Sequence, residues 1–354
     1  MRIEASAPGR CGILGNPTDG YGGCVISCSL KQRARVVLTT PADALSVTVA
    51  GETATLRTRA DFALKDDYFD CVRAVVSYLR RYDLKFHVEL STEVPVNAGL
   101  AGSTAVLVSV LTAVLKLLET EKGVKHLLPV GPEGAAHKRG LTPFISHRHY
   151  LAEMLRTIEL NYLKIQCGYQ DQYMAVFGGL NYMDFRGKEF YRDLDSELYA
   201  TVEPLEGCVE TLPFVVVHTG VKRVSGTVLR PIRERWEEGD REVRDGYARI
   251  TRLAQRGKRA LVDGDWPTVA RLMNENHRIQ QTLGASGVEN DRLIDVALQN
   301  GALAAKLAGA GGGGTILALT FEPERTIAAL MREGAAEIIH PVPSPGVTCE
   351  VVEA

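Results

Sequence analysis

The sequence has little of several features that would assign a protein to a class. Its seven cysteines are an odd number, lie scattered, and form no C-x-x-C pair, which argues against a disulfide framework or a zinc site. Acidic and basic residues nearly balance at a formal net charge of −2. Because no basic block occurs either, non-specific binding to nucleic acid or to an anionic membrane is a poor expectation. We therefore expect reduced thiols and no nucleic-acid partner.

Long hydrophobic runs and a signal segment are also missing. The N-terminal stretch MRIEASAPGR has no apolar core, so we expect no signal peptide. The most apolar stretch, residues 106–118, is interrupted by Ser109, Thr112 and Lys116 and is too short to cross a bilayer. These absences predict a soluble, cytoplasmic protein with no membrane partner.

What is present fits a folded chain of two domains. The 354 residues are 45% hydrophobic and 24% charged, as in ordinary globular proteins. Apolar residues at helical spacing predict helices over 69–82, 103–118 and 146–163. Alternating or continuous apolar runs predict strands within 26–55 and at 84–90, 180–185, 213–218 and 316–320. Strands and helices in both halves predict an α+β fold with domains at 1–210 and 211–354. Residues 119–142 show little periodicity, and we interpret them as a loop or an insertion.

The first of three glycine-rich clusters is APGRCGILGNPTDGYGG, residues 7–23. Glycines let the backbone approach a ligand closely, and Arg10, Asn16 and Asp19 supply polar side chains nearby. The alternative interpretation is a solvated turn between two strands.

The second cluster, EVPVNAGLAGSTA at residues 93–105, runs directly into the predicted apolar helix. A helix N-terminus presents unpaired N–H groups to an anion, and small residues let phosphate oxygens reach them. The Gly-Lys-Ser/Thr ending of a Walker A loop is absent. The alternative is that Ser103 only caps the helix. We interpret the segment as a phosphate-binding loop whose residues are Asn97, Ala98, Gly99, Leu100, Ala101, Gly102, Ser103 and Thr104.

The third cluster, KLAGAGGGG at residues 306–314, holds five glycines in six residues, more than a hairpin needs. Between the second and third clusters lies QCGYQDQYMAVFGG, residues 166–179, which contains Asp171. Asp171 could accept a hydroxyl proton while Glu159, twelve residues earlier, could hold a metal, which is the set that phosphoryl transfer requires. A helix cap for Asp171 and a solvated face for Glu159 are the alternatives.

In their order and spacing the three clusters resemble the three motifs of the GHMP kinase superfamily, and this resemblance covers nearly the whole chain. It implies two α+β domains, a ribosomal-protein-like one followed by a ferredoxin-like one, with ATP and substrate in the cleft between them. It also implies the cofactors ATP and Mg²⁺.

Within that superfamily the sequence is most similar to kinases that phosphorylate the anomeric hydroxyl of a sugar. The stretch GNPTDGYGG resembles plant glucuronokinases, and GYQDQY resembles both these and the bacterial heptose-7-phosphate kinases. APGR resembles galactokinases too, but Asn16 and Pro17 depart from their Glu-His pair. The resemblance favours glucuronic acid as the acceptor, with a heptose 7-phosphate as the alternative.

The resemblance assigns roles to residues. It implies that Asp171 is catalytic, that Arg10 lies beside the reacting hydroxyl, and that Ser103 and Glu159 bind Mg²⁺. The glycine loop at 309–314 would shape the cleft around the transferred phosphate. The predicted substrate-binding set is Asn16, Asp19, Gly168, Gln170, Gly311 and Gly312.

Several questions stay open at this stage. A mevalonate or homoserine kinase, a decarboxylase of the same superfamily, and a non-catalytic sugar sensor are the rival functions. The oligomeric state, a homodimer among the options, is open as well. The cation that would receive a substrate carboxylate or phosphate is also unassigned, the candidates being Lys138, Arg139, Arg148, Lys222 and Arg223.

Overall fold

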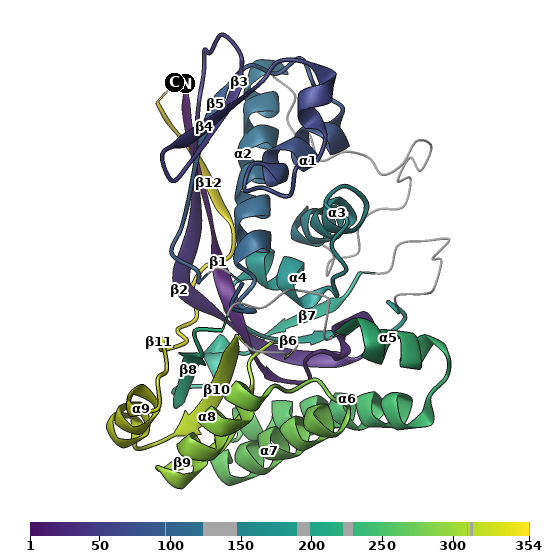
Figure 1. The fold of residues 1–354 in the computed structure, drawn as a ribbon, viewed down its shortest axis with the longest axis vertical. Coiled ribbons are helices and arrows are strands. Elements are labelled where there is room, and N and C mark those ends of the chain that lie inside the picture. The colour runs from purple at the N-terminus through teal and green to yellow at the C-terminus, as the bar shows by residue number, and fades with distance from the viewer. Residues whose placement is uncertain are drawn as a thin grey trace.

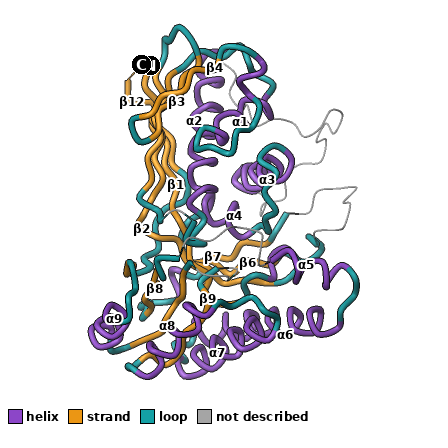
Figure 2. Tube along the Cα trace, in the orientation of Figure 1, coloured by secondary structure: helices purple, strands orange, loops and turns teal. Residues whose placement is uncertain are grey.

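The computed structural model describes residues 1–95, 97–122, 147–189, 199–221, 229–309, 311 and 314–353. Two parts are stacked along the long axis of the molecule, each containing a β-sheet and helices (Figure 1). The colouring by secondary structure in Figure 2 shows the helices α1–α4 beside the upper sheet and α5–α9 around the lower one.

The first sheet has eight strands, in the order β12-β1-β2-β5-β3-β4, with β6 pairing with β2 and β7. Its pairs are antiparallel except for β3 with β5. Its strands are β1 (Arg2–Leu14), β2 (Cys24–Thr39), β3 (Leu45–Val49), β4 (Glu52–Leu56), β5 (His87–Thr92), β6 (Leu180–Asp184), β7 (Thr201–Pro204) and β12 (Thr348–Glu353).

The second sheet has four antiparallel strands in the order β11-β8-β10-β9. They are β8 (Phe214–His218), β9 (Ala302–Leu307), β10 (Thr315–Thr320) and β11 (Glu337–Ile339). The helices are α1 (Asp70–Leu79), α2 (Gly102–Lys122), α3 (His147–Asn161), α4 (Gln170–Phe177), α5 (Leu229–Glu237), α6 (Arg241–Val262), α7 (Trp266–Thr282), α8 (Val288–Gln299) and α9 (Pro323–Arg332).

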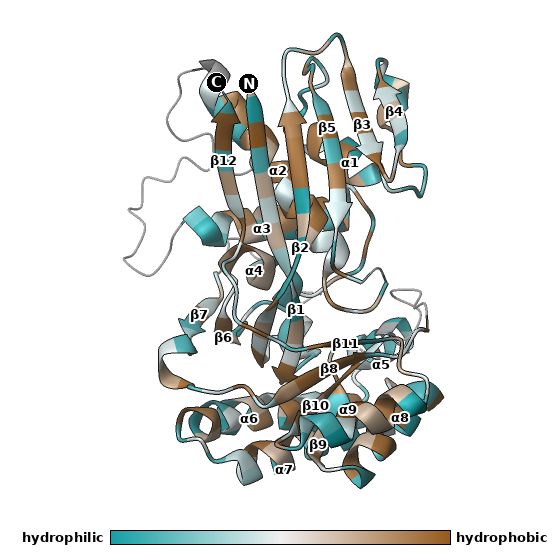
Figure 3. Cartoon of the chain, turned by 90° about the vertical axis from the view of Figure 1, so that its left-hand side faces the viewer, coloured by the Kyte–Doolittle hydropathy of each residue, from teal (hydrophilic) through white to brown (hydrophobic). Residues whose placement is uncertain are grey.

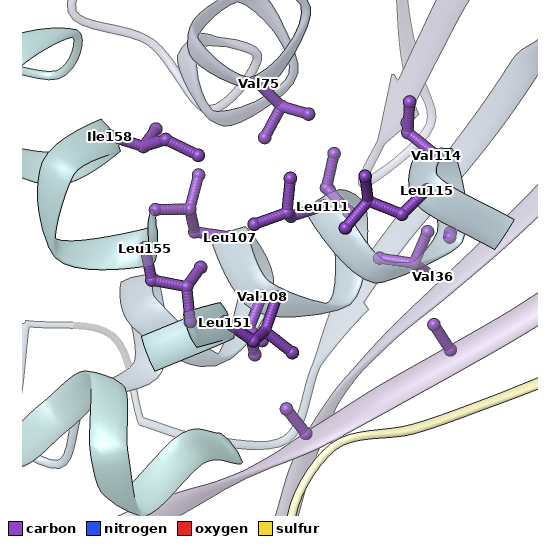
Figure 4. Packing of buried hydrophobic residues seen from close by; sticks show 14 of the residues in the cluster. Val36, Val75, Leu107, Val108, Leu111, Val114, Leu115, Leu151, Leu155 and Ile158 are labelled. Carbon is purple, nitrogen blue, oxygen red and sulfur yellow. The ribbon is translucent and has the colours of Figure 1, made fainter. Parts of the chain in front are cut away.

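The helices of the first part cover one face of the first sheet, and the other face is turned to the viewer in Figure 3. The apolar residues of α2 pack between this sheet and α1 and α3, as Figure 4 shows for Leu107 and Leu111 of α2 and Leu155 of α3. By length and composition α2 could cross a membrane, but 67% of its most apolar window is buried inside the molecule. It is therefore the central core helix of the first part.

The predicted helices and most of the predicted strands are confirmed. The main difference is β1, because the sequence interpretation placed residues 7–23 in one turn, whereas the strand runs to Leu14. Glycine is required inside this strand by close neighbours: a Cβ at Gly9 would lie 2.9 Å from the carbonyl oxygen of Leu100. The first residues of the segment predicted as a loop at 119–142 are helical instead, because α2 continues to Lys122. Its remainder lies outside the described residues.

The last strand, β12, returns to the first sheet and pairs with residues 2–6 of β1. A division of the chain at residue 210 stays our proposal for the domain boundary, with the qualification that β12 belongs to the first sheet. The two ends of the chain consequently lie side by side (Figure 1).

Candidate functional site

The centre of the site is an ion pair between β1 and the first turn of α4. Arg10 donates from Nε (2.8 Å) and from Nη2 (2.5 Å) to the same oxygen, Oδ1, of Asp171. The Arg10 side chain is 8% exposed and that of Asp171 is 32% exposed. The arginine is therefore fixed within the protein, while the carboxylate is accessible to a ligand.

Arg10 also holds the second glycine-rich cluster in place. Its Nη1 donates to the carbonyl oxygen of Gly99 (2.6 Å), and its backbone N–H donates to that of Leu100 (3.0 Å). The loop turns sharply, with positive φ at Asn97 (56°), Gly99 (77°) and Ala101 (61°). It leads directly into α2, whose first N–H groups and partial positive charge favour an anion. Arg10 thus connects an anion-binding helix end with a reachable carboxylate.

Glu159 of α3 lies close to this helix end. Its Oε1 accepts a hydrogen bond from the hydroxyl of Thr104 (2.6 Å), and its Oε2 accepts one from the side-chain amide of Gln172. Burial raises the pKa of Glu159 to about 7, and the negative charge of Asp171 adds to that rise, while the Thr104 hydroxyl opposes it. The neighbouring Ser103 is exposed, so the hydroxyl that contacts Glu159 is that of Thr104.

These groups have the donor chemistry that Mg²⁺ prefers. Magnesium is bound in kinases by one or two carboxylates together with phosphate oxygens and water. Glu159 and the hydroxyls of Ser103 and Thr104 are hard oxygen donors next to the start of α2, where the N–H groups favour an anion. Burial raises the pKa of Glu159 because it disfavours the charged carboxylate, and a cation beside that carboxylate would favour the charged form. Among the described residues, no group of three or more His, Cys, Asp or Glu side chains gathers as a separate metal cluster.

Asp19 joins the first cluster to the start of α4. Its Oδ2 accepts hydrogen bonds from the backbone N–H groups of Tyr169 (2.7 Å) and Gln170 (2.9 Å). Burial raises the pKa of Asp19, and the amide of Gln170 opposes this shift. A Cβ at Gly168 would lie 1.9 Å from Oδ2, so this position has no room for a side chain. The side chain of Gln170 is itself buried and donates to Ser27 (3.0 Å).

Asn16 takes a different place from the one expected of a sugar ligand. It is 2% exposed, and its side-chain amide faces the third cluster, donating to the carbonyl oxygen of Gly309 (2.7 Å). Its Oδ1 accepts a hydrogen bond from the buried ammonium group of Lys306 (2.8 Å). A direct contact between Asn16 and a sugar stays a prediction, which these inward-facing hydrogen bonds do not favour.

The third cluster packs against the second. A Cβ at Gly309 would lie 2.9 Å from the carbonyl oxygen of Gly99, and one at Gly314 would lie 2.7 Å from that of Ala98. Gly311 has a positive φ of 101° and lies against the carbonyl of Ala285. The other glycine predicted to bind substrate, Gly312, lies outside the described residues.

The structure therefore brings most of the predicted residues together around Arg10 and Asp171. Of the cations proposed to receive an anionic substrate group, Arg148 is exposed near the far end of α4, with its guanidinium 6.0 Å from the ring centroid of Phe177. The other four cations lie outside the described residues. Sequence reasoning missed Gln172 and Lys306. A charged residue within the apolar strand sequence ALAAKL is the signal that could have drawn attention to Lys306.

Comparisons with known proteins agree with this arrangement. Residues 70–142 match the family model described as the GHMP kinases N terminal domain, and residues 258–337 match the one described as GHMP kinases C terminal. Glucuronokinase 1 of Arabidopsis thaliana is 26% identical over 331 residues, covering 88% of this chain and 83% of that protein. Mevalonate kinase of Thermococcus onnurineus is 24% identical over 375 positions, covering 99% of both.

The fold is shared with a solved structure as well. A D-glycero-D-manno-heptose 1-phosphate kinase from Bacteroides thetaiotaomicron superposes with a TM-score of 0.70 at 21% identity, covering 99% of this chain and 100% of that one. The two-part α+β fold expected from the glycine-rich clusters is thereby confirmed.

Proposed function

Because this chain belongs to the GHMP kinase superfamily and its relatives include a glucuronokinase and a mevalonate kinase, we propose that it phosphorylates the anomeric hydroxyl of a sugar with ATP. The favoured acceptor is glucuronic acid. The observation that carries the proposal is the Arg10–Asp171 pair, which places an accessible carboxylate beside the anion-binding start of α2.

The reaction needs positioning and charge stabilisation more than covalent help from the protein. In our proposal the N–H groups at 97–104 hold the terminal phosphates of ATP, and Asp171 orients the acceptor hydroxyl and takes its proton. Arg10 offsets negative charge on the transferring group while holding Asp171 in place. Glu159 and the hydroxyl of Ser103 or Thr104 would hold Mg²⁺, which would supply further neutralisation of phosphate charge.

Sugar recognition rests on motif and comparison together. The stretches GNPTDGYGG and GYQDQY resemble glucuronokinases, and Glucuronokinase 1 is among the relatives that match over most of their length. A heptose phosphate is the second candidate, supported by GYQDQY and by the sequence similarity to a heptose 7-phosphate kinase of Campylobacter jejuni. We also propose a cytoplasmic location and small-molecule partners only, with a homodimer as an open option.

An ADP-release screen tests the acceptor. The acceptors are glucuronic acid, galactose, a heptose 7-phosphate and mevalonate, each with ATP and Mg²⁺, and ³¹P NMR identifies the phosphorylated oxygen. We expect turnover with glucuronic acid and a product phosphorylated at the anomeric oxygen. Turnover only with the heptose phosphate or with mevalonate would reject glucuronic acid. Carbon dioxide release would indicate a decarboxylase, and sugar binding without ADP release would indicate a sensor.

Replacing Asp171 by Asn tests the catalytic assignment. We expect kcat to fall by at least ~10², the scale for losing a general base, while the Kd for ATP changes little. Asp83→Asn is the matched control, because Asp83 pairs with Arg81 and has 67% of its side chain exposed. Near-normal turnover of the Asp171→Asn protein would contradict the proposed role.

A further inference from the structure

A lysine lies buried where the third glycine-rich cluster begins. Lys306, on β9, is 0% exposed. Its ammonium group donates to three neutral oxygen atoms: Oδ1 of Asn16 (2.8 Å), the carbonyl of Leu307 (2.5 Å) and, at 3.5 Å, the carbonyl of Gly12. Among the described residues no carboxylate pairs with it. Burying an ammonium group without a carboxylate is costly, so an apolar residue would be expected here if only packing were needed.

Asn16 connects Lys306 to the carbonyl oxygen of Gly309. With Oδ1 occupied by the lysine, the side-chain NH₂ group of Asn16 is directed at the carbonyl oxygens of Gly309 (2.7 Å) and Leu307 (3.4 Å). The lysine nitrogen donates to Oδ1 of Asn16, and this contact holds the amide with its NH₂ group toward Gly309. A second fixed contact, from the N–H of Gly12 to the carbonyl of Ala308 (2.8 Å), joins the same two segments.

The third cluster contacts the loop that Arg10 holds at the reacting centre. Gly309 packs against the carbonyl of Gly99, the oxygen that receives a 2.6 Å hydrogen bond from Arg10. Arg10 in turn holds Asp171. A continuous series of contacts therefore connects the buried lysine on β9 with the carboxylate on α4. We call this series the path from Lys306 to Asp171.

We propose that Lys306 is a positioning residue for phosphoryl transfer, which acts through Asn16 and the carbonyl of Gly309 to hold the Gly99 loop against Arg10. The proposal rests on the proposed kinase function. It also gives Asn16 a role within the protein in place of a contact with sugar. Recognition of the acceptor then falls to other residues of the cleft.

Two variants interrupt the path at different links. Lys306→Met keeps the length of the side chain and removes the ammonium group. Asn16→Asp keeps the shape and the acceptor for Lys306 but removes the NH₂ group that reaches Gly309. We expect each to lower kcat by roughly tenfold to 10²-fold, the range for a misplaced catalytic group, with the acceptor KM changed less than about threefold. Because both act on one path, the double variant should fall little below the worse single variant.

Thr326→Val is the control for simple destabilisation. Thr326 is buried on α9, outside the path, and its hydroxyl bonds the carbonyl of Asn300 (2.9 Å). We expect it to lower the Tm but leave kcat within about twofold below the Tm. Amide hydrogen exchange over residues 97–105 adds a readout that needs no acceptor. Exchange there should be faster in Lys306→Met and Asn16→Asp than in the wild type and in Thr326→Val.

The outcomes separate the two proposals. A wild type without turnover on any acceptor contradicts the proposed function, while the exchange measurement still tests the path. Wild-type exchange over 97–105 in both variants, or kcat losses no larger than that of Thr326→Val, would overturn the role of Lys306. An increase in acceptor KM at constant kcat in Asn16→Asp would overturn it too, because that result marks Asn16 as a sugar ligand. If Lys306→Met does not fold, the kcat and the amide exchange of Asn16→Asp alone test the role of Lys306.

Discussion

Gly168 shows how closely a single residue is constrained at this site. Its missing side chain leaves the space into which Asp19 extends to reach the N–H groups of Tyr169 and Gln170. A methyl group at this position would displace the carboxylate and break both hydrogen bonds.

Gly168→Ala should therefore lower both stability and activity. We expect a loss of about 1–3 kcal/mol in the free energy of unfolding, the usual range for an overpacked site, and at least a tenfold loss of kcat/KM. Gly207→Ala is the matched control, since no atom lies within 4 Å of its added Cβ. Denaturant unfolding and the ADP-release assay measure the two effects, and a Gly168→Ala protein that behaves like Gly207→Ala would refute the argument.

Lys306 gives a pH dependence with a defined sign. Burial lowers the pKa of Lys306 from 10.5 to about 7, with the charge of Arg10 acting in the same direction. Between these two values the unfolded chain binds a proton that the folded chain has lost, so stability rises with pH across this window. The gain is up to about 1.4 kcal/mol per pH unit.

Comparing the wild type with Lys306→Met isolates this contribution. The difference in the free energy of unfolding should grow in favour of the wild type from pH 7 to pH 10, and it should stay constant below pH 6. Urea unfolding at one-unit pH steps measures it. A difference that does not change between pH 7 and pH 10 would show that the lysine keeps its proton.

Sequence reasoning indicated the residues to which we assign chemistry, but it missed some of the residues that contact them. The motif resemblance indicated Arg10 and Asp171 separately, and the structure joins the two side chains in one ion pair. The inward turn of Asn16 could not be foreseen, because it depends on a lysine 290 positions away in the sequence. The contact of Gln172 with Glu159 likewise depends on how α3 and α4 pack.

At the scale of elements, β12 is the edge strand that attaches the last residues of the sequence to the first sheet. It pairs with residues 2–6 of β1, while most of its side chains are exposed. Its contribution comes from backbone hydrogen bonds to β1 more than from apolar burial. Each such bond is worth about 0.5–1.5 kcal/mol.

Removing residues 348–354 should therefore lower the Tm by a few °C, with activity retained at low temperature because Arg10 lies beyond the paired stretch. The double substitution Val351→Ser and Val352→Ser keeps the backbone and should leave the Tm within about 1 °C, as substitutions of exposed side chains usually do. Thermal unfolding by circular dichroism distinguishes the two. Equal losses of Tm would show that the side chains hold the strand.

Elements with a clear period were predicted well, and those defined by their partners were not. The amphipathic helix at 69–82 is α1, and the buried run at 213–218 is β8. The pairing of β12 with the first strand joins residues more than 340 positions apart, which no local pattern reveals. The strand β1 was missed over 7–14 because glycines that usually indicate a turn are here required by close packing.

For the whole molecule, the long strands β1 and β2 link the two parts. Their ends contribute Ile13 and Ile26 to one core cluster with Leu253 of α6 and Met273 of α7. A core shared in this way makes it costly to unfold one part while the other stays folded.

We therefore expect a single cooperative unfolding transition. Both tryptophans, Trp236 and Trp266, lie in the second part, so their fluorescence reports on that part, whereas far-UV circular dichroism reports on the whole chain. The two signals should give the same midpoint in urea. Separate midpoints would show that the shared core does not couple the parts.

The return of β12 to β1 has a use in engineering. Since Arg2 and Glu353 are register partners, a linker of a few residues would join the two ends into a ring. New termini could then be opened at the partly exposed turn around Gly239, between α5 and α6, which contributes no residue to the reacting centre. A circular permutant of this kind would carry fusion partners or labels on the second part, at the opposite end of the molecule from the natural termini (Figure 1).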